Sequence, residues 1–411
     1  PIMTVLKRER GINVMKFNKV VKGGLAAVMA MSLAACSSKS GDDAKGTAST
    51  TGEAFKLGGS GPTTGDAAVY GLAVQHGAEL AVKEINAEGK VQLELNYQDD
   101  QADGEKAVTA FNNLVDWGMQ VSIGATTSGA GQAVSAEYKA EDIFALTPSG
   151  SSPAVIYQDS DNEKDPYGNV FQMCFTDPNQ GAASADYISE HKVGTKVGVI
   201  YRNDDSYSSG IYKKFKAEAD KLGLTVVAEQ TFTNGNADFS TQVSKCKEAG
   251  ADVVFLPIYY QPASQILAEA KKQEYDVKFF GCDGMDGILS MEGFDTSLAE
   301  GLYMLTPFST DAEDEKTQNF VKNYQEAYGE TPIQFAADAY DCVYAIAQAL
   351  EAAGVSPSDS TSDITAALVE QFTSMTFNGL TGTDVTWNEN GEVTKAPKAV
   401  VIQDGAYVSA E

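Results

Sequence analysis

Four short segments carry side chains suited to binding a small polar molecule, and each follows a stretch typical of a β-strand. Residues 124–132 (GATTSGAGQ) and 147–153 (TPSGSSP) are rich in hydroxyl groups and glycine. Residues 281–287 (GCDGMDG) place an acidic side chain between glycines, and residues 258–261 (IYYQ) supply aromatic rings. Hydroxyls and free N–H groups at a helix start attract a carboxylate. The acidic segment can instead present its carboxylate to a cation.

The two hydroxyl-rich segments have expected places in the local structure. Ser128 is placed to cap the helix that follows a strand at residues 121–124, where the helix dipole favours an anion. Pro153 suits a first helical position, so Ser152 is expected to be its cap and Ser151 is left free to face a cleft. Either segment alone indicates only a helix cap. Two of them at consecutive strand ends of one sheet indicate a binding site.

Residues that could support catalysis or hold a metal are scarce. The two histidines, His76 and His191, have no His, Cys or carboxylate neighbour at zinc spacing, and the chain contains no HExxH, GxSxG or P-loop motif. Residues 159–165 (DSDNEKD) resemble the start of a calcium loop. However, Lys164 stands where glycine is needed, and Val170 where the bidentate acid should be. We therefore expect no enzyme activity, no metal and no cofactor.

Length and charge narrow the class of protein further. The chain has 411 residues and a formal net charge of -27 at pH 7. A chain of this length is expected to form two domains. The strong negative charge argues against a nucleic-acid partner, which needs a basic surface.

The elements that would position the four segments alternate between strand-like and amphipathic stretches, as in parallel βαβ units. A first series predicts helices at residues 70–86 and 105–117, and strands at 91–97, 121–124 and 143–146. A second predicts strands at 196–201, 224–229, 251–257 and 277–280, and helices at 212–222, 239–249 and 263–275. An irregular stretch is expected at 149–168. Two series predict an α/β protein with two lobes and a ligand cleft at the strand carboxyl ends.

The N-terminal residues predict export and a lipid anchor. Three lysines follow Met15, and an uncharged apolar run over residues 25–35 ends at Cys36. The run is too short to span a bilayer and fits a signal-peptide core. Residues 1–35 are predicted to be a signal peptide, with Met15 as the expected true start and residues 1–14 as misassigned upstream sequence. Residues 36–53 are predicted to be the lipidated Cys36 and a flexible tether.

The other four cysteines are Cys174, Cys246, Cys282 and Cys342. Exported proteins often pair cysteines, but no CxxC spacing is present and each of these lies among apolar residues. We expect four buried thiols.

Several motifs, in order over nearly all of residues 54–411, resemble those of the branched-chain amino-acid (Leu/Ile/Val) binding proteins of ABC importers. The motifs are GPTTGDAAVYG at 61–71, HGAELAVKEINAEG at 76–89, YQDDQADGEKAV at 97–108, IGATTSG at 123–129, FQMCFTDPNQG at 171–181, YYQPASQIL at 259–267, GCDGMDG at 281–287 and VTWNENGEV at 385–393. The resemblance implies a type I periplasmic-binding fold: two Rossmann-like lobes with parallel sheets, joined by a three-strand hinge. It also implies a lipoprotein form that delivers free amino acids to permease subunits.

The resemblance also implies roles for individual residues. The ligand carboxylate would be held by the hydroxyl and backbone N–H of Ser128 and of Ser151. The ammonium would be held by the carbonyl of Ser149 and the side chains of Ser151 and Asp283. Aromatic side chains at positions that line or close the pocket are Tyr70, Tyr207, Tyr259 and Phe335. A zwitterion leaves water only if both charges find partners, so only the closed form would satisfy both ends.

The same resemblance implies domain limits and a cellular location. Residues 54–177 and 306–396 would form the N-terminal lobe, and residues 178–305 and 397–411 the C-terminal lobe, with crossovers near 177, 305 and 397. The protein would be an extracytoplasmic monomer, anchored by lipid to the outer face of a Gram-positive-type cytoplasmic membrane, or periplasmic.

The sequence departs from the family pattern at two positions, and three alternative functions remain open. Thr127 stands where a family cysteine is common, which predicts loss of a family disulfide, and Asp283 stands where some members carry Glu. Another ligand, such as an aromatic amino acid, a short amide or urea, is an alternative within the fold. A sensory ectodomain and an extracellular enzyme are alternatives from other classes.

Overall fold

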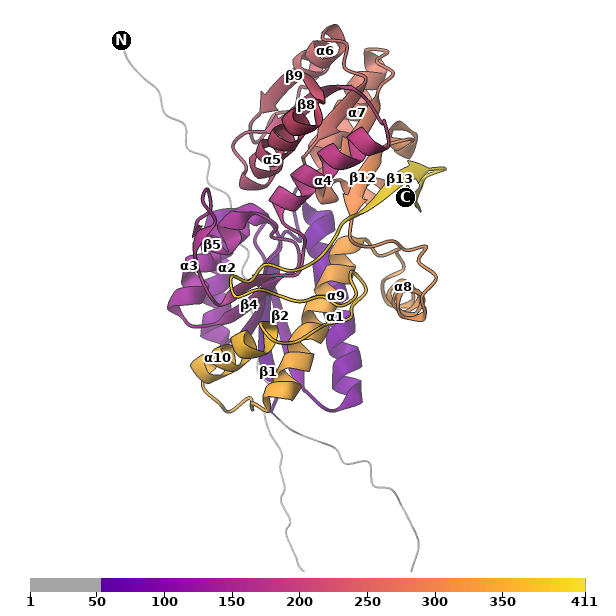
Figure 1. Cartoon of the computed structure of the whole chain (residues 1–411). Helices are drawn as coiled ribbons and strands as arrows, with labels where there is room; N and C mark the ends of the chain where they lie inside the picture. The colour runs from indigo at the N-terminus through magenta and orange to yellow at the C-terminus, as the bar shows by residue number, and fades with distance from the viewer. Residues whose placement is uncertain (1–52, 411) are drawn as a thin grey trace, which may run out of the picture. The chain divides into compact units, whose positions relative to one another are not determined.

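A computed structural model describes residues 53–410 of the chain. The predicted signal peptide, Cys36 and all but the last residue of the predicted tether lie outside the described residues. Over residues 53–410, no helix is long and apolar enough to cross a membrane. The backbone forms two α/β lobes, each built on one main sheet (Figure 1).

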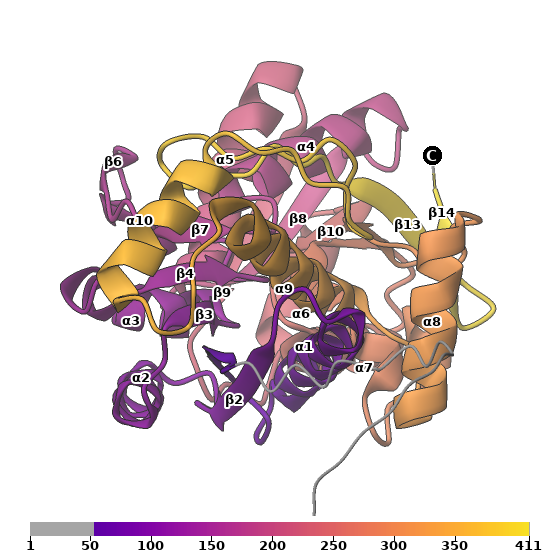
Figure 2. The ribbon, with the colours of Figure 1, turned by 90° about the horizontal axis from the view of Figure 1, so that it is seen from below.

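The first lobe contains a five-stranded parallel sheet in the order β2-β1-β3-β4-β7. Its strands are β1 (Phe55–Gly61), β2 (Leu93–Asp99), β3 (Val121–Ala125), β4 (Phe144–Thr147) and β7 (Val170–Gln172). One face packs against α1 (Ala68–Glu88), α9 (Gln334–Ala353) and α10 (Thr361–Phe372), and the other against α2 (Gly104–Trp117) and α3 (Ser128–Ala140), as Figure 2 shows. Helix α8 (Glu315–Tyr328) packs on α1.

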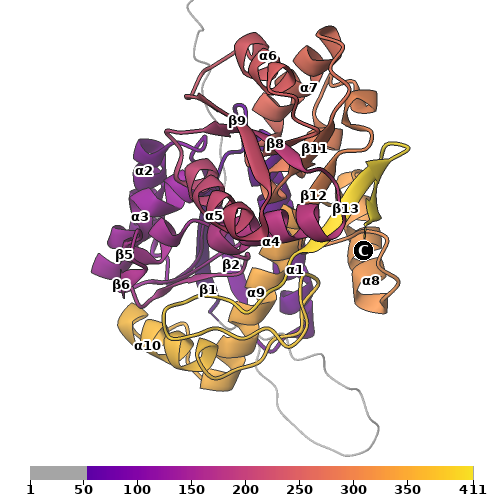
Figure 3. The ribbon, with the colours of Figure 1, turned by 45° about the horizontal axis from the view of Figure 1, so that its top comes forward.

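The second lobe contains a seven-stranded sheet in the order β14-β13-β12-β11-β10-β8-β9. Its parallel strands are β8 (Lys196–Arg202), β9 (Thr225–Phe232), β10 (Val253–Leu256), β11 (Lys278–Gly281) and β12 (Tyr303–Thr306), and its antiparallel edge is β13 (Lys398–Gln403) and β14 (Ala406–Ser409). Helices α4 (Asp177–Glu190) and α5 (Ser206–Leu222) lie side by side on one face, with α6 (Ser240–Glu248) and α7 (Tyr260–Lys272) on the other (Figure 3).

Strand β10 shows why a central strand of such a sheet has an uninterrupted apolar sequence. Val253 and Phe255 pack in the core beneath α4 and α5, whereas Val254 and Leu256 pack in the core that includes α6 and α7. A strand covered by helices on both faces buries every side chain. The sequence VVFL therefore specifies a central strand.

The two lobes share one strand order. In each, five parallel strands follow the doubly wound order 2-1-3-4-5, so the order reverses between β1 and β3 in the first lobe and between β8 and β10 in the second. Ligands of such folds bind beside the carboxyl ends of strands at this reversal. The chain passes between the lobes three times, over residues 173–176, 307–314 and 394–397. The third passage is the yellow segment that leads to β13 in Figure 1.

A buried ion pair holds the third passage against the first lobe. The Lys395 ammonium lies 3.0 Å from Oδ1 of Asp338 in α9, and both side chains are buried. It also donates to the Thr381 hydroxyl at 2.6 Å. A charge buried without its partner is strongly destabilising. The pair therefore fixes where this passage leaves the first lobe.

The structure confirms the predicted fold class and most of the predicted elements, although several bounds shift by two or three residues and two differences are larger. The helix predicted at 212–222 begins earlier, at Ser206, because the Asp205 side chain caps it by accepting from the N–H of Ser208. The expectation that residues 149–168 are irregular is confirmed only in part. They contain a 3-10 turn, η1 (Pro153–Val155), and a hairpin of β5 (Tyr157–Asp159) and β6 (Lys164–Pro166), whose two rungs are too short to give an alternating pattern.

Candidate functional site

The first lobe brings its two hydroxyl-rich loops together at the carboxyl ends of β3 and β4. The Ser149 hydroxyl donates to the Thr126 carbonyl at 2.5 Å, and the Ser152 N–H donates to Oγ of Ser128 at 3.2 Å. Each loop thus positions the other. The sequence prediction that both segments lie at one edge of one sheet agrees with this arrangement.

The predicted cap of α3 was wrong. Thr127, not Ser128, is the residue before the first helical turn, and no side chain caps this helix. The Ser128 hydroxyl is instead used across the loops, where it accepts from Ser152. The expected cap at Ser152 is confirmed: its hydroxyl accepts from the Ala154 N–H, and Pro153 takes the first helical position.

At the end of β11, the second lobe presents the Asp283 carboxyl group, which is hydrogen-bonded to the Tyr207 hydroxyl. The Tyr207 hydroxyl donates to Oδ1 of Asp283 at 2.6 Å and accepts from the Gly284 N–H at 2.8 Å. Oε1 of Gln180 accepts from the Asp283 N–H at 3.2 Å. Burial raises the pKa of Asp283 to about 7, against the opposing effect of the hydrogen bonds from Tyr207 and Gln180. A cationic ligand would offset that burial.

Tyr70 joins the two lobes across the site. Its hydroxyl, carried on α1 of the first lobe, donates to the Gly284 carbonyl and accepts from the Tyr260 N–H at 3.2 Å. Its ring lies 4.3 Å from the ring of Phe335 and 5.2 Å from that of Tyr259, measured between centroids.

Gln334, at the start of α9, makes the second link across the cleft. Its side-chain amide donates to the Asp283 carbonyl at 2.7 Å, and its N–H donates to Oδ2 of Asp286 at 2.8 Å. The lobes are therefore closed over the site.

A small cavity of about 10 Å³, close to the space that one water molecule needs, lies between these groups. Six of the side chains predicted for the site line it: Tyr70, Ser149, Tyr207, Tyr259, Asp283 and Phe335. Thr126, Thr127 and Gly284 also line it and were not predicted as site residues. The signal for the two threonines was present, since they belong to the same hydroxyl-rich segment as Ser128.

The two serines predicted to hold the ligand carboxylate do not line the cavity in this form. Ser128 is engaged with the Ser152 backbone, and Ser151 is fully buried. The Ser151 hydroxyl has no hydrogen-bond partner of good geometry, although it lies close enough to the Asp177 carboxyl to act on its pKa. Buried polar groups in this condition are rare in proteins and call for an explanation.

Asp177 is a site neighbour that sequence reasoning missed. It is 0% exposed at the start of α4, and neither carboxyl oxygen has a hydrogen-bond partner of good geometry. Burial, with further contributions from Asp283 and Asp205, raises its pKa well above the usual range. Its only sequence signal was the motif TDPNQG, which the resemblance included without a role for the acid.

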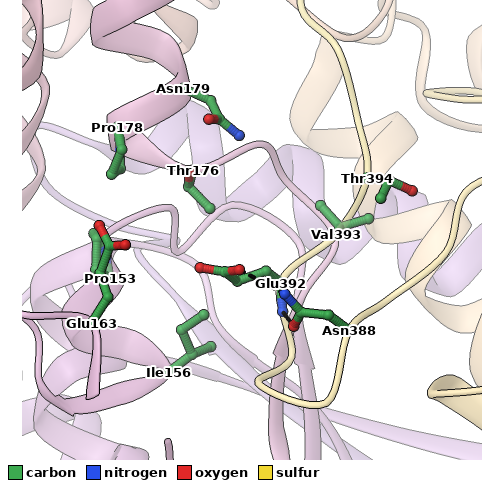
Figure 4. A pocket seen from close by; sticks show the side chains of 10 residues that line it. All are labelled: Pro153, Ile156, Glu163, Thr176, Pro178, Asn179, Asn388, Glu392, Val393 and Thr394. Atoms are coloured by element: carbon green, nitrogen blue, oxygen red, sulfur yellow. Dashed lines mark hydrogen bonds between the residues drawn. The ribbon is translucent and has the colours of Figure 1, made fainter.

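Two other cavities differ in character from the small one. A larger open cavity shares Thr127 and Tyr259 with it and forms the mouth of the cleft, where amide and acidic side chains predominate. The other lies beside the first and third passages and is drawn in Figure 4. Its carboxylates have partners already: Glu392 accepts from Tyr157 and Asn388, and Glu163 pairs with Lys214.

The described residues contain no group of three or more His, Cys, Asp and Glu side chains that could hold a metal. Cys174, Cys246, Cys282 and Cys342 are free and buried, as predicted. Burial raises the pKa of each thiol, which disfavours the reactive thiolate.

Neither histidine is near the small cavity's lining. His76 pairs with Glu330 at 3.1 Å and stacks on Tyr328, and His191 stacks on Tyr187. The site chemistry consists of hydrogen bonding and charge.

Known proteins similar to this chain include amino-acid-binding proteins. The Leu-, Ile-, Val-, Thr- and Ala-binding protein of Pseudomonas aeruginosa is 26% identical, over 74% of this chain and 80% of its own. Two solved structures also match. The branched-chain amino acid transporter substrate-binding protein LivJ of Streptococcus pneumoniae, in complex with isoleucine, has a TM-score of 0.76 and 28% identity, over 87% of this chain and 99% of its own.

The second is an ABC transporter substrate-binding protein of Desulfitobacterium hafniense in complex with leucine. It has a TM-score of 0.70 and 25% identity, over 87% of this chain and all of its own. The model of the family described as periplasmic binding protein matches residues 54–406. This family comprises binding proteins of transporters rather than enzymes. With its strand order, its closed cleft and a match over nearly all of the described residues, the chain belongs to the periplasmic binding protein family.

Proposed function

We propose that this protein is the extracytoplasmic receptor of an ABC importer and captures free amino acids, branched-chain or other neutral ones, in the cleft between its lobes. The observation that carries this proposal is the opposition of two chemistries in one cavity. Hydroxyl-bearing side chains of the first lobe, Asp283 of the second and aromatic side chains line the same cavity. A zwitterion with an apolar side chain matches this set of groups.

The residues have distinct roles in this proposal. Asp283 and the Ser149 carbonyl hold the ammonium, while Ser128 and Ser151 hold the carboxylate through hydroxyl and backbone N–H groups. The Ser151 hydroxyl, which is buried without a good partner, gains one when ligand is bound. The rings of Tyr70, Tyr207, Tyr259 and Phe335 enclose the ligand.

The lobes themselves act as the moving parts. Residues 54–177 and 306–396 make one body and residues 178–305 and 397–411 the other, with the three passages between them as the hinge. Ligand held from both sides favours the closed form, which the permease subunits recognise. One chain supplies both sides of the site, so the receptor acts as a monomer.

Thermal unfolding in the presence of each of the twenty amino acids tests the proposal. A ligand at a hundredfold excess over its dissociation constant adds about 2.7 kcal/mol to the free energy of unfolding. We expect a clear rise in Tm with at least one neutral amino acid. A chain that none of the twenty stabilises is not an amino-acid receptor.

Lipidation of Cys36, after removal of residues 1–35, anchors this receptor to the outside of the cytoplasmic membrane. Cys36→Ser is expected to release the protein from the membrane fraction of the producing cell, measured by fractionation and immunoblotting, because Cys36 is the predicted lipid acceptor. Ser38→Ala is the matched control and should remain membrane-bound. A Cys36→Ser protein found in the membrane fraction without lipid contradicts the anchor.

A further inference from the structure

The part of the small cavity that would surround a ligand side chain has few wholly apolar groups, which is unusual for a site that binds an aliphatic ligand. Apart from the groups assigned to the ammonium, its lining comprises Thr126, Thr127 and three phenols, and Phe335 is the one wholly apolar side chain. Pockets for apolar side chains are lined predominantly by apolar groups.

The hydrogen bonds of these groups single out Thr127. The Thr126 hydroxyl donates to the Ser60 carbonyl at 3.0 Å and bonds the Tyr97 hydroxyl at 2.8 Å, so it is satisfied within the first lobe. The Thr127 side chain is 5% exposed, and its hydroxyl has no hydrogen-bond partner. It does not cap α3, although it stands at the cap position.

Within the described part of the chain, the Tyr259 hydroxyl is a second one without a hydrogen bond, and Tyr259 lines the same two cavities as Thr127. Thr127 and Tyr259 line both the small cavity and the cleft mouth, so they form the wall between the two. Tyr259 packs its ring against Tyr70 and Tyr207. Among the described contacts, its phenol takes part in no hydrogen bond, and a ligand side chain directed at this wall would meet two hydroxyls.

We propose that the ligand side chain carries a hydrogen-bonding group that pairs with the Thr127 hydroxyl, so that the receptor prefers threonine to its isostere valine. This inference rests on the proposed function, and names the side-chain class within it. A site that hydrogen-bonds a ligand hydroxyl rejects the analogue that lacks it, because the protein group is then left buried and unpaired. Aliphatic amino acids would still bind, but less tightly.

Titration calorimetry with L-threonine and L-valine on three proteins tests the inference. The wild type is expected to bind threonine at least about tenfold more tightly than valine, a difference typical of one unsatisfied buried hydroxyl. Thr127→Val keeps the shape of the side chain and removes the hydroxyl. It should weaken threonine binding, strengthen valine binding and abolish the preference.

Thr127→Ser keeps the hydroxyl and is the rescue variant, which should retain the preference for threonine. A wild type that binds valine as tightly as threonine overturns the inference, as does a Thr127→Val protein that still prefers threonine. Binding of leucine or another amino acid with neither threonine nor valine also overturns it, while the proposed function stands. Binding of no amino acid at all removes the proposed function itself.

Discussion

The two lobes have the same strand order but contribute opposite chemistry to the site. The first lobe ends β3 and β4 in short hydroxyl-rich loops, which tie to each other through Ser149 and Ser128. The second ends β11 in Asp283, which Tyr207 of α5 orients. A common topology therefore places the strand ends, and the residues after the strands decide which chemical groups each lobe presents at the site.

This division explains why closure can report occupancy. The first lobe offers no charged side chain to the ammonium of a zwitterion, and the second offers none of the carboxylate donors, so the bound ligand gains its full set of interactions only between closed lobes. Tyr70 and Gln334 supply protein–protein bonds beside the site that join the lobes directly. The free energy that biases the hinge is thus shared between these bonds and the ligand.

The contrast between the lobes is tested most strongly by removing the negative charge of Asp283, which the second lobe contributes to the site. Asp283→Asn keeps the side chain's shape, and it should weaken ligand binding by about 2–5 kcal/mol, because the ligand ammonium is left without its charged partner. Titration calorimetry with the best amino-acid ligand measures the loss.

Asp205→Asn is the matched control for that variant. It removes one negative charge from the cleft mouth but keeps a good helix cap, so its effect should be small. If Asp283→Asn binds like the wild type, the ammonium is held by another group and the assigned roles of the two lobes fail.

A smaller loss is expected from the first lobe. Ser128→Ala removes one neutral donor to the ligand carboxylate and leaves the backbone N–H, so it should cost about 1.5–3 kcal/mol of binding free energy. The same calorimetry measures it. Ser135→Ala is the control, since Ser135 is a buried serine of the same helix that bonds the Gly131 and Val155 carbonyls. Equal losses for the two variants would mean that Ser128 acts only through the fold.

The positions of the strand-end residues could be predicted from the sequence, but their orientations could not. Tyr259 follows an apolar strand that is fully buried, and Asp283 follows the strand KFFG, whose second half is buried, so the pattern predicts their place at the sheet edge. Thr127 and Ser128 could not be told apart, because one residue step at a helix start turns the side chain by about 100°. Only the packing of the neighbouring loop decides which of them lines the cavity.

Asp177 shows a second limit of the sequence. Its burial depends on the packing of α4 against α5, and the contact at Gly210 brings the α5 backbone close to its carboxyl group. Such an approach between distant segments leaves no local pattern. The N-cap of α5 at Asp205 was missed for a simpler reason: the apolar periodicity of that helix begins only one turn later.

The titration of Asp283 gives a third test, in which the second lobe changes its charge without a mutation. Burial raises its pKa to about 7 in the closed form. Below this pH the acid is protonated and must lose its proton to bind an ammonium. Affinity should therefore fall as the pH drops below about 7, by at most about 1.4 kcal/mol per pH unit, and level off above it.

The stability of the ligand-free closed protein should show the opposite trend. Between the unfolded pKa of about 4 and the folded pKa of about 7, the folded state binds more protons than the unfolded state, so the free energy of unfolding falls as the pH rises. Calorimetry and denaturant unfolding at several pH values measure both trends. Asp283→Asn should flatten the affinity profile and make the stability profile less steep, since Asp177 also has a raised pKa and keeps part of the stability trend. A variant with both profiles unchanged would assign the titration to another group.

The smallest effect is expected from the bonds that join the lobes directly. Tyr70→Phe keeps the ring that packs on Phe335 but removes the hydroxyl that bonds the Gly284 carbonyl and the Tyr260 N–H. These bonds exist only when the lobes are closed, so their loss should cost about 1 kcal/mol of binding free energy and appear mainly as faster ligand dissociation. Stopped-flow dissociation measures it. Tyr97→Phe, which loses a bond to Thr126 within the first lobe, should leave that rate nearly unchanged, and equal acceleration in both would show that Tyr70 does not act through closure.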